Sequence, residues 1–322
     1  MRILIGIAIF SGVIVLLIAL FAVYHRLKLR IEQKKIVPNG RLIEVNGYQM
    51  HVYVEGNNKE APTLVFLSGS TITSPVYDFK PVWSRLSKEY RIAVVERLGY
   101  GYSDVADTSR DIDTLLKETR AALSLADVVG PYVLCPHSLS GLESLRFAQI
   151  SPEEVAGIVG IDMLVPDYFL ENGESLVKQF AQLKSVRPIF WMGMHRLPIP
   201  SETFKLSTLA LTEKEQEQSE LLAVRNLFND AIFNEVDHLF DNARIVVESG
   251  AVNVPIKLLV ANRQATPEMS KNWIQAGEKF AEEYHLPIKS FDSGHSLHQE
   301  KPEAVADEIS EFVKGLKNNK NI

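Results

Sequence analysis

The chain is poor in the residues on which several common protein classes depend. Cys135 is the only cysteine among its 322 residues, which excludes an internal disulfide framework and a zinc cage built from thiolates. It also lacks an excess of basic residues, because its formal net charge is −6, so nothing indicates a nucleic-acid-binding surface. With 46% hydrophobic and 23% charged residues, the chain is too apolar to be disordered. What remains is an ordinary globular composition with one apolar segment added.

The N-terminal segment carries no charge from Ile3 to Val23, a run of 21 residues. As a helix this run would extend roughly 31 Å, close to the hydrocarbon thickness of a bilayer. A secretory signal is the competing interpretation, but its apolar part usually covers about 7–15 residues and ends at an A-x-A-like cleavage site. No good site of this kind follows the run. We therefore predict a retained single-pass anchor in residues 1–35, with the span at about 3–23.

The charges around this run predict the orientation of the anchor. Only Arg2 precedes the run, whereas a basic cluster containing one acidic residue, Glu32, follows it. Lys and Arg are retained on the cytoplasmic side of membranes, so we expect a cell-membrane protein whose large C-terminal part is cytoplasmic. The basic residues of the cluster are Arg26, Lys28, Arg30, Lys34 and Lys35.

The rest of the chain alternates short apolar runs with helical patterns. Asn46-Gly47, between two alternating segments, predicts a two-residue hairpin. The later alternation indicates an α/β fold with a mostly parallel sheet covered by helices on both faces. From about residue 164 to residue 247 the pattern is helical only, which predicts a helical lid inserted between two strands. We therefore expect an α/β core formed by 36–163 and 248–322, with the lid at 164–247.

Ser138 lies in the segment L-C-P-H-S-L-S-G-L (134–142), between a predicted strand and a predicted helix. A serine on such a sharp turn exposes its oxygen over the sheet edge at a helix N-terminus. The segment resembles the nucleophile elbow of the α/β-hydrolase superfamily, whose pattern is G-x-S-x-G. Pro136 and Ser140 replace the two glycines of that pattern, and a helix N-cap is the alternative role for Ser138. The resemblance implies the α/β-hydrolase fold with Ser138 as its nucleophile.

A second segment, S-G-H-S-L-H (293–298), follows the last predicted strand. It resembles the superfamily's histidine segment, in which the histidine comes seven residues before a helix-starting proline. His295 has this spacing to Pro302 and His298 does not. A serine hydroxyl is a weak nucleophile until an imidazole removes its proton, so the resemblance implies that His295 is the base. The two histidines could also be imagined as metal ligands, but no third ligand is near in sequence, and we expect no metal.

Two glycine-containing loops match further motifs. Ser68-Gly69-Ser70 follows an early strand, where the superfamily carries an H-G-x loop. The resemblance implies an oxyanion hole formed by the backbone amides of Ser70 and Leu139. Segment 96–104, E-R-L-G-Y-G-Y-S-D, resembles the superfamily's D-x-R-G-x-G-x-S-D loop. Its G-x-G lacks the third glycine and the following helix of a dinucleotide site, so we expect no cofactor.

The acid departs most from the superfamily pattern. Gln264 stands where most members carry an aspartate, after the predicted strand 256–260. Some lipases place the acid at the end of the preceding strand, and here the run 155–161 ends in Asp162. The resemblance therefore implies a Ser-His-Asp triad with Asp162 as the acid and Glu268 as the alternative. A cap for the first turn of the lid is the other role open to Asp162.

These motifs predict a membrane-anchored serine hydrolase that cleaves carboxyl-ester or amide bonds through an acyl-enzyme. A serine nucleophile argues against the dehalogenase and epoxide-hydrolase branches of the superfamily, whose elbows carry aspartate. The apolar lid segment 189–194 could line an acyl pocket, which favours a small lipophilic acyl substrate.

Two alternatives stay open. An aminopeptidase of the proline-iminopeptidase type is less supported, because the H-G-G-P-G loop of that branch is absent. A non-catalytic α/β-hydrolase-like module, tethered to the membrane for binding or signalling, would account for the departures at Ser68, Pro136, Ser140 and Gln264.

Overall fold

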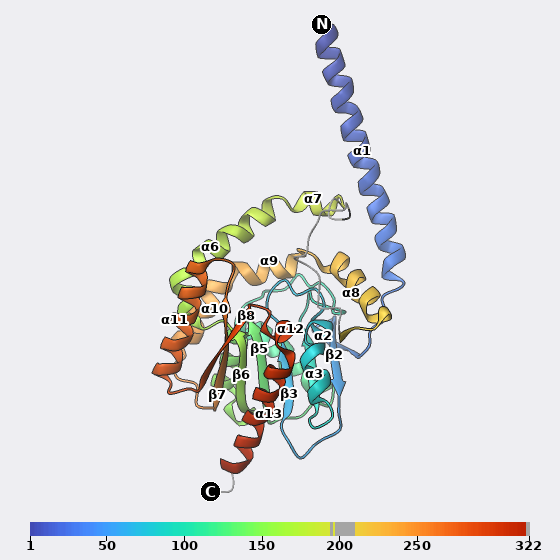
Figure 1. Cartoon of the computed structure of the whole chain (residues 1–322). Coiled ribbons are helices and arrows are strands. Elements are labelled where there is room, and N and C mark those ends of the chain that lie inside the picture. Colours follow the sequence, from blue (N-terminus) through green and yellow to red (C-terminus); the bar gives the residue numbers. More distant parts are fainter. Residues whose placement is uncertain (194–195, 197–209, 320–322) are drawn as a thin grey trace.

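A computed structural model describes residues 1–193, 196 and 210–319 of the chain (Figure 1). In this part of the chain an eight-stranded sheet has the order β1-β2-β4-β3-β5-β6-β7-β8. β2 pairs antiparallel with β1 and β4, and the remaining neighbours pair in parallel. The mostly parallel sheet predicted from the sequence is therefore present. The strands are β1 (Arg41–Val45), β2 (Tyr48–Glu55), β3 (Thr63–Leu67), β4 (Ile92–Glu96), β5 (Tyr132–Ser138), β6 (Val155–Met163), β7 (Ile256–Arg263) and β8 (Ile288–Gly294).

The hairpin between β1 and β2 forms at the predicted two residues. Asn46 has φ +53° and Gly47 has φ +83°. Two-residue hairpins favour turns in which both central residues have positive φ, because their twist matches that of the strands. The Asn-Gly sequence therefore sets the register in which Val45 pairs with Tyr48.

Helices cover both faces of the sheet. Outside the connection between β6 and β7, the described helices are α1 (Arg2–Gln33), which does not cover the sheet, α2 (Pro75–Asp78), α3 (Lys80–Leu86), α4 (Ile112–Leu125), α5 (Ser140–Ile150), the 3-10 turn η1 (Pro152–Glu154), α11 (Pro267–Glu283), α12 (Leu297–Glu300) and α13 (Pro302–Asn319).

The apolar core has two halves, one on each face of the sheet. Successive side chains of a strand point to opposite faces, so Leu134 of β5 packs with α4, α5 and α11, whereas Val133 and Cys135 pack with α2, α3 and α13. Strands buried on both faces are apolar throughout, and every residue of β3 and β4 is buried. The carboxyl ends of the parallel strands are thereby held rigidly at one edge.

Helix α1 extends away from this body, and the N-terminus lies far from the sheet (Figure 1). It has 32 residues, which corresponds to about 48 Å at 1.5 Å per residue. The segment Ile3–Gln33 has a mean hydropathy of 3.1 in its most apolar window, none of which is buried. By length and composition the helix can cross a membrane.

The described part of the connection between β6 and β7 is helical, and its first helices lie on the side of the sheet from which α1 extends (Figure 1). Thr212 and Glu215 form a capping box that starts α8. The predicted acyl-pocket segment ends at Met194, which is outside the described residues. The helices are α6 (Pro166–Ser185), α7 (Arg187–Trp191), α8 (Glu213–Asn226), α9 (Asp230–Asp237) and α10 (Leu239–Glu248).

Candidate active site

Ser138 is the last residue of β5, and α5 begins two residues later at Ser140. Its φ is +53°, in the left-handed region that non-glycine residues adopt mainly where surrounding structure enforces it. The turn places the Ser138 side chain, which is partly exposed, at the carboxyl edge of the sheet. This is the geometry expected of a nucleophile elbow.

The two substitutions in the elbow pattern form part of one structure. Pro136 pairs with Leu67 of β3 and has no N–H to donate. The buried Ser140 hydroxyl lies 2.6 Å from the Leu67 carbonyl oxygen and accepts a hydrogen bond from the His137 amide at 3.0 Å. Ser140 is therefore small enough for the elbow and supplies polar contacts that a glycine would not.

His295 directly follows β8 and joins the other two predicted residues. Its Nε2 lies 2.9 Å from Ser138 Oγ, and its Nδ1 lies 2.6 Å from Asp162 Oδ2. The His295 side chain is 37% exposed, whereas Asp162 is fully buried. The structure thus brings Ser138, His295 and Asp162 into one chain of hydrogen bonds.

Asp162 lies near the end of β6 with φ +47°, and its carboxylate accepts from three groups besides His295. Oδ1 accepts from the Ala261 amide at 2.8 Å and from Trp273 Nε1 at 2.7 Å, and Oδ2 accepts from Gln264 Nε2 at 3.0 Å. A buried charge is costly unless its oxygens are satisfied. Both oxygens of Asp162 are therefore satisfied by hydrogen bonds next to the imidazole.

Gln264 stands where the resemblance to the superfamily places the acid in most members, and its side-chain amide donates to the Asp162 carboxylate. Glu268, the alternative acid, is exposed in the first turn of α11. His295 Nδ1 contacts Asp162 instead. Of the two candidates, only Asp162 is brought to the imidazole.

The loop after β3 lies against the nucleophile. A Cβ added to Gly69 would be 2.7 Å from Ser138 Cβ and 3.2 Å from its Oγ, so no side chain fits there. Ser70 follows in the same loop, and Leu139 is the N-cap of α5. Backbone amides at a helix start have no partner within the helix. Of the predicted oxyanion residues, Ser70 therefore follows the glycine packed against Ser138, and Leu139 follows Ser138 itself.

Arg97 connects this loop to two helices. Its guanidinium is 2.9 Å from the Ser68 carbonyl oxygen, 3.0 Å from Glu143 of α5 and 3.1 Å from Glu235 of α9, and Tyr100 also donates to Glu235 at 2.8 Å. Burial by itself would lower the pKa of Arg97, but the neighbouring groups raise it above its ordinary value. Arg97 is therefore a fixed cation that holds the Ser68 loop in place.

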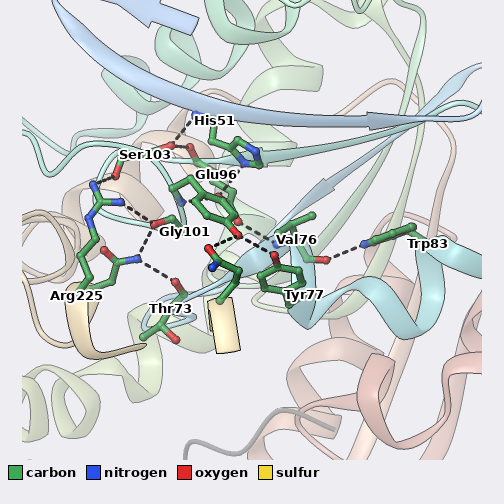
Figure 2. A network of polar contacts seen from close by, with 12 residues as sticks. His51, Thr73, Val76, Tyr77, Trp83, Glu96, Gly101, Ser103 and Arg225 are labelled. Carbon is green, nitrogen blue, oxygen red and sulfur yellow. Dashed lines mark hydrogen bonds and ion pairs between the residues drawn. The ribbon is translucent and has the colours of Figure 1, made fainter. Parts of the chain in front are cut away.

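The loop after β4 is held by Glu96. This buried carboxylate accepts from the Val76 amide at 3.0 Å and from the Tyr102 amide at 2.7 Å. Ser103 Oγ donates to the Glu96 carbonyl oxygen at 2.5 Å and accepts from the His51 amide at 2.8 Å (Figure 2). The G-x-G segment therefore closes around a protein carboxylate.

A cluster of buried side chains lies behind His295. The pKa of His137 is held well below its usual value, first by burial and then by His298 and His295. His137 Nε2 is 3.0 Å from the His295 carbonyl oxygen, which can only accept, so this nitrogen donates. His298 Nε2 is 2.7 Å from Asp78 Oδ2.

Asp78, His137 and His298 have donor atoms within 4.8 Å of one another, a set that could hold a metal ion. Two of their ring nitrogens already make the hydrogen bonds just described. As arranged, the cluster anchors the backbone at His295. The sequence offered His295 and His298 as a possible pair of metal ligands, but the group of three contains His298 and not His295.

Sequence reasoning did not find several of these groups. Trp273 lies in the middle of α11, and nothing in its sequence surroundings marks it as a partner of Asp162. His137 could have been noticed as the neighbour of the nucleophile. Gln264 departs visibly from the superfamily pattern, but its contact with Asp162 does not follow from the sequence.

Comparison with known proteins agrees with this architecture. A family model described as the alpha/beta hydrolase family matches residues 64–308. The uncharacterized protein YbdG of Bacillus subtilis (strain 168) is 32% identical over 302 residues, which are 92% of this chain and 92% of that protein.

Solved structures are similar at lower identity. Epoxide hydrolase A from Mycobacterium thermoresistibile has a TM-score of 0.62 at 19% identity, covering 87% of this chain and 99% of that one. A mutant epoxide hydrolase from Bacillus megaterium has a TM-score of 0.65 at 16% identity, covering 85% and 100%. At such identities the likeness concerns the fold, and the predicted fold is confirmed.

Proposed function

The chain belongs to the alpha/beta hydrolase family, as its motifs indicate, and on this basis we propose that it is a membrane-anchored serine hydrolase cleaving carboxyl-ester bonds. Family membership supports a hydrolase. The finer proposal depends on one observation, the continuous hydrogen bonding from Ser138 Oγ through His295 to Asp162. Ser138 also stands where the dehalogenase and epoxide-hydrolase branches carry an aspartate.

In the acylation step, Ser138 Oγ attacks the carbonyl carbon of the ester while His295 Nε2 takes the hydroxyl proton. The amides of Ser70 and Leu139 would donate to the oxyanion that develops. The imidazolium is stabilised by Asp162, 2.6 Å away. His295 then gives the proton to the alcohol oxygen, the C–O bond breaks, and the alcohol leaves.

Deacylation repeats these roles with water. His295 removes a proton from a water molecule, and the resulting hydroxide attacks the acyl carbonyl. When the second tetrahedral intermediate collapses, the proton returns from His295 to Ser138 Oγ and the free acid leaves. Asp162 gains and loses no proton in these steps, and it holds the imidazole through His295 Nδ1.

We further propose that α1 anchors the enzyme in the cell membrane, with the catalytic part on the cytoplasmic side. The exposed apolar window of α1 and the basic residues that follow it carry this proposal. A catalytic site tied to a bilayer favours lipophilic acyl substrates. Protection of the C-terminal part from protease in intact cells is the expected result, and digestion from outside would contradict the orientation.

A fluorophosphonate probe tests the catalytic proposal, because it reacts covalently with activated serine hydroxyls. We expect labelling of the full chain that disappears in Ser138→Ala and is retained in Ser124→Ala, a control serine exposed on α4. Hydrolysis of esters with increasing acyl length would then define the substrate. A folded chain that is not labelled and hydrolyses no ester would favour the non-catalytic module.

A further inference from the structure

The last turns of α1 are in contact with the lid. His25 is buried, and a Cβ added to Gly193, just after α7, would lie 2.5 Å from its Cβ. Arg196 Nε donates to His25 Nδ1 at 2.7 Å, and its Nη1 donates to Glu32 Oε1 at 2.9 Å. Polar and close contacts thus join the end of α7 to α1, and Figure 1 shows the two side by side.

The chain after α1 is also fixed to the body of the protein. Gln218 of α8 donates to the Lys35 carbonyl oxygen and accepts from the Val37 amide, both at 2.8 Å. From the same helix, Arg225 reaches the carbonyl oxygens of Gly101 and Ser103 in the loop after β4 (Figure 2). Two sets of contacts therefore hold α1 at a defined angle to the lid.

This attachment fixes the height of the lid relative to the bilayer. The uncharged run ends at Val23, and His25 lies about 3 Å further along the helix. The polar layer on each side of the hydrocarbon core is about 5–8 Å thick. Because Gly193 contacts His25 directly, the end of α7 lies at the level of the lipid headgroups when α1 spans the membrane.

The side chains at this level suit a lipid surface. Ile189 and Trp191 of α7 are 45% and 55% exposed, and tryptophan is enriched at the boundary between membrane and water. Arg187 lies over the Trp191 ring, 4.3 Å from its centroid. Arg26 and Lys28 of α1 add positive charge at the same height, which attracts anionic headgroups.

A cavity of about 420 Å³ opens beside these residues. It lies between α1, α7 and the junction of α8 and α9, and its walls include Phe190, Trp191 and Phe228. Asn229, also in its wall, donates to the Gly99 carbonyl oxygen at 2.7 Å, next to Tyr100 of the active-site region. The cavity wall is thus joined to the loop after β4, which Arg97 connects to the Ser68 loop.

We propose that the end of α7 and residues 24–30 of α1 form one surface that contacts the bilayer, with Ile189 and Trp191 among the lipid headgroups. The proposal rests on the anchoring role of α1 proposed above. It goes further, because a spanning helix alone would leave the lid in solvent. The partner of this surface is the lipid of the same membrane.

The test uses the full chain in vesicles of phosphatidylcholine and phosphatidylglycerol, with bromine atoms on the acyl carbons nearest the headgroup. Bromine quenches nearby indole fluorescence. We expect brominated vesicles to quench the wild type more than unbrominated ones, and Trp191→Phe to lose that quenching. Phenylalanine keeps an aromatic ring under Arg187, and the buried Trp83 and the partly buried Trp273 provide the background signal.

A matched control moves the indole to the opposite edge of the sheet. Val129 is 73% exposed in the loop before β5, so Val129→Trp in the Trp191→Phe chain should show no bromine quenching. Flotation of each chain with the vesicles separates two failures. If the wild type floats with the vesicles but bromine does not quench Trp191, the proposed contact of α7 with the bilayer is wrong, while the anchor still holds. If the wild type does not float, both the anchor and the contact of α7 with the bilayer are wrong.

Discussion

Replacing Asp162 with asparagine tests the arrangement of the site most directly. The carboxylate accepts on both oxygens, from Ala261 and Trp273 on Oδ1 and from His295 and Gln264 on Oδ2. An asparagine has one accepting oxygen and one donating NH₂ group. In either orientation, the NH₂ group must face two groups that are donors in the wild type.

Each orientation has a cost. If the NH₂ group replaces Oδ2, it donates to His295 Nδ1, so the ring hydrogen moves to Nε2 and the imidazole can no longer accept the proton of Ser138. If it replaces Oδ1, two buried donors lose their acceptor, at about 1–3 kcal/mol each. The first orientation is the cheaper one, because the imidazole can change its tautomer. A wrong tautomer reduces kcat by about 10⁴-fold, or about 5 kcal/mol of barrier.

We therefore expect Asp162→Asn to lower kcat on a short-chain nitrophenyl ester by about 10³–10⁴-fold, with KM nearly unchanged. The rate of fluorophosphonate labelling should fall in parallel. Glu268→Gln, which alters the exposed alternative acid, should leave both rates near those of the wild type. Activity of Asp162→Asn within a few-fold of the wild type, in protein whose thermal unfolding is unchanged, would refute the reasoning.

Three further predictions concern neighbouring elements. Gly69→Ala should lower kcat by about 10²-fold, since its Cβ, 2.7 Å from Ser138 Cβ, must displace the loop; unchanged kcat in the ester assay would contradict this contact. Gln264→Leu removes one hydrogen-bond donor from the Asp162 carboxylate and should destabilise the site by about 1.5–3 kcal/mol, measured as slower fluorophosphonate labelling of Ser138. Gln264→Glu should be labelled more slowly still, because it places a second negative charge beside Asp162. Asp111 caps α4, and although partial burial raises its pKa, hydrogen bonds from Thr114 and Ser109 lower it to about 2. Asp111→Ala should therefore cost about 1 kcal/mol at neutral pH, a difference that shrinks as pH falls from about 4 to 2, because protonation removes what the ionised cap contributes; a difference independent of pH in thermal unfolding would contradict it.

The features that could be predicted from the sequence depend on local patterns. The hairpin follows from Asn46-Gly47, because that pair adopts positive φ easily. The sequence could also single out Ser138 and His295, which the structure brings within 2.9 Å, because a tight strand-to-helix turn and a fixed distance to Pro302 are properties of contiguous sequence. The parallel sheet follows from apolar runs long enough for strands and buried on both faces.

The unpredicted features depend on residues that meet only in the folded chain. Trp273 is about a hundred residues from Asp162 in sequence and reaches it because α11 packs against β7. The contact between His25 and Arg196 joins segments separated by 171 positions. A single sequence carries no periodic signal for such pairs, since each side chain is ordinary in its own helix.

The proposed position of the acid also affects how this scaffold can vary. Ser138 and Asp162 lie at the ends of β5 and β6, adjacent strands in which Ser138 pairs with Met163. Their relative position is therefore fixed by one strand pair, whose strands lie about 4.8 Å apart. The turn after β7 supplies only the supporting amide of Gln264. We expect insertions and substitutions in the turn after β7 to be tolerated better here than in superfamily members whose acid lies in that turn. Descendants of this chain could therefore lengthen the turn into a new substrate-contacting loop and keep the proposed triad.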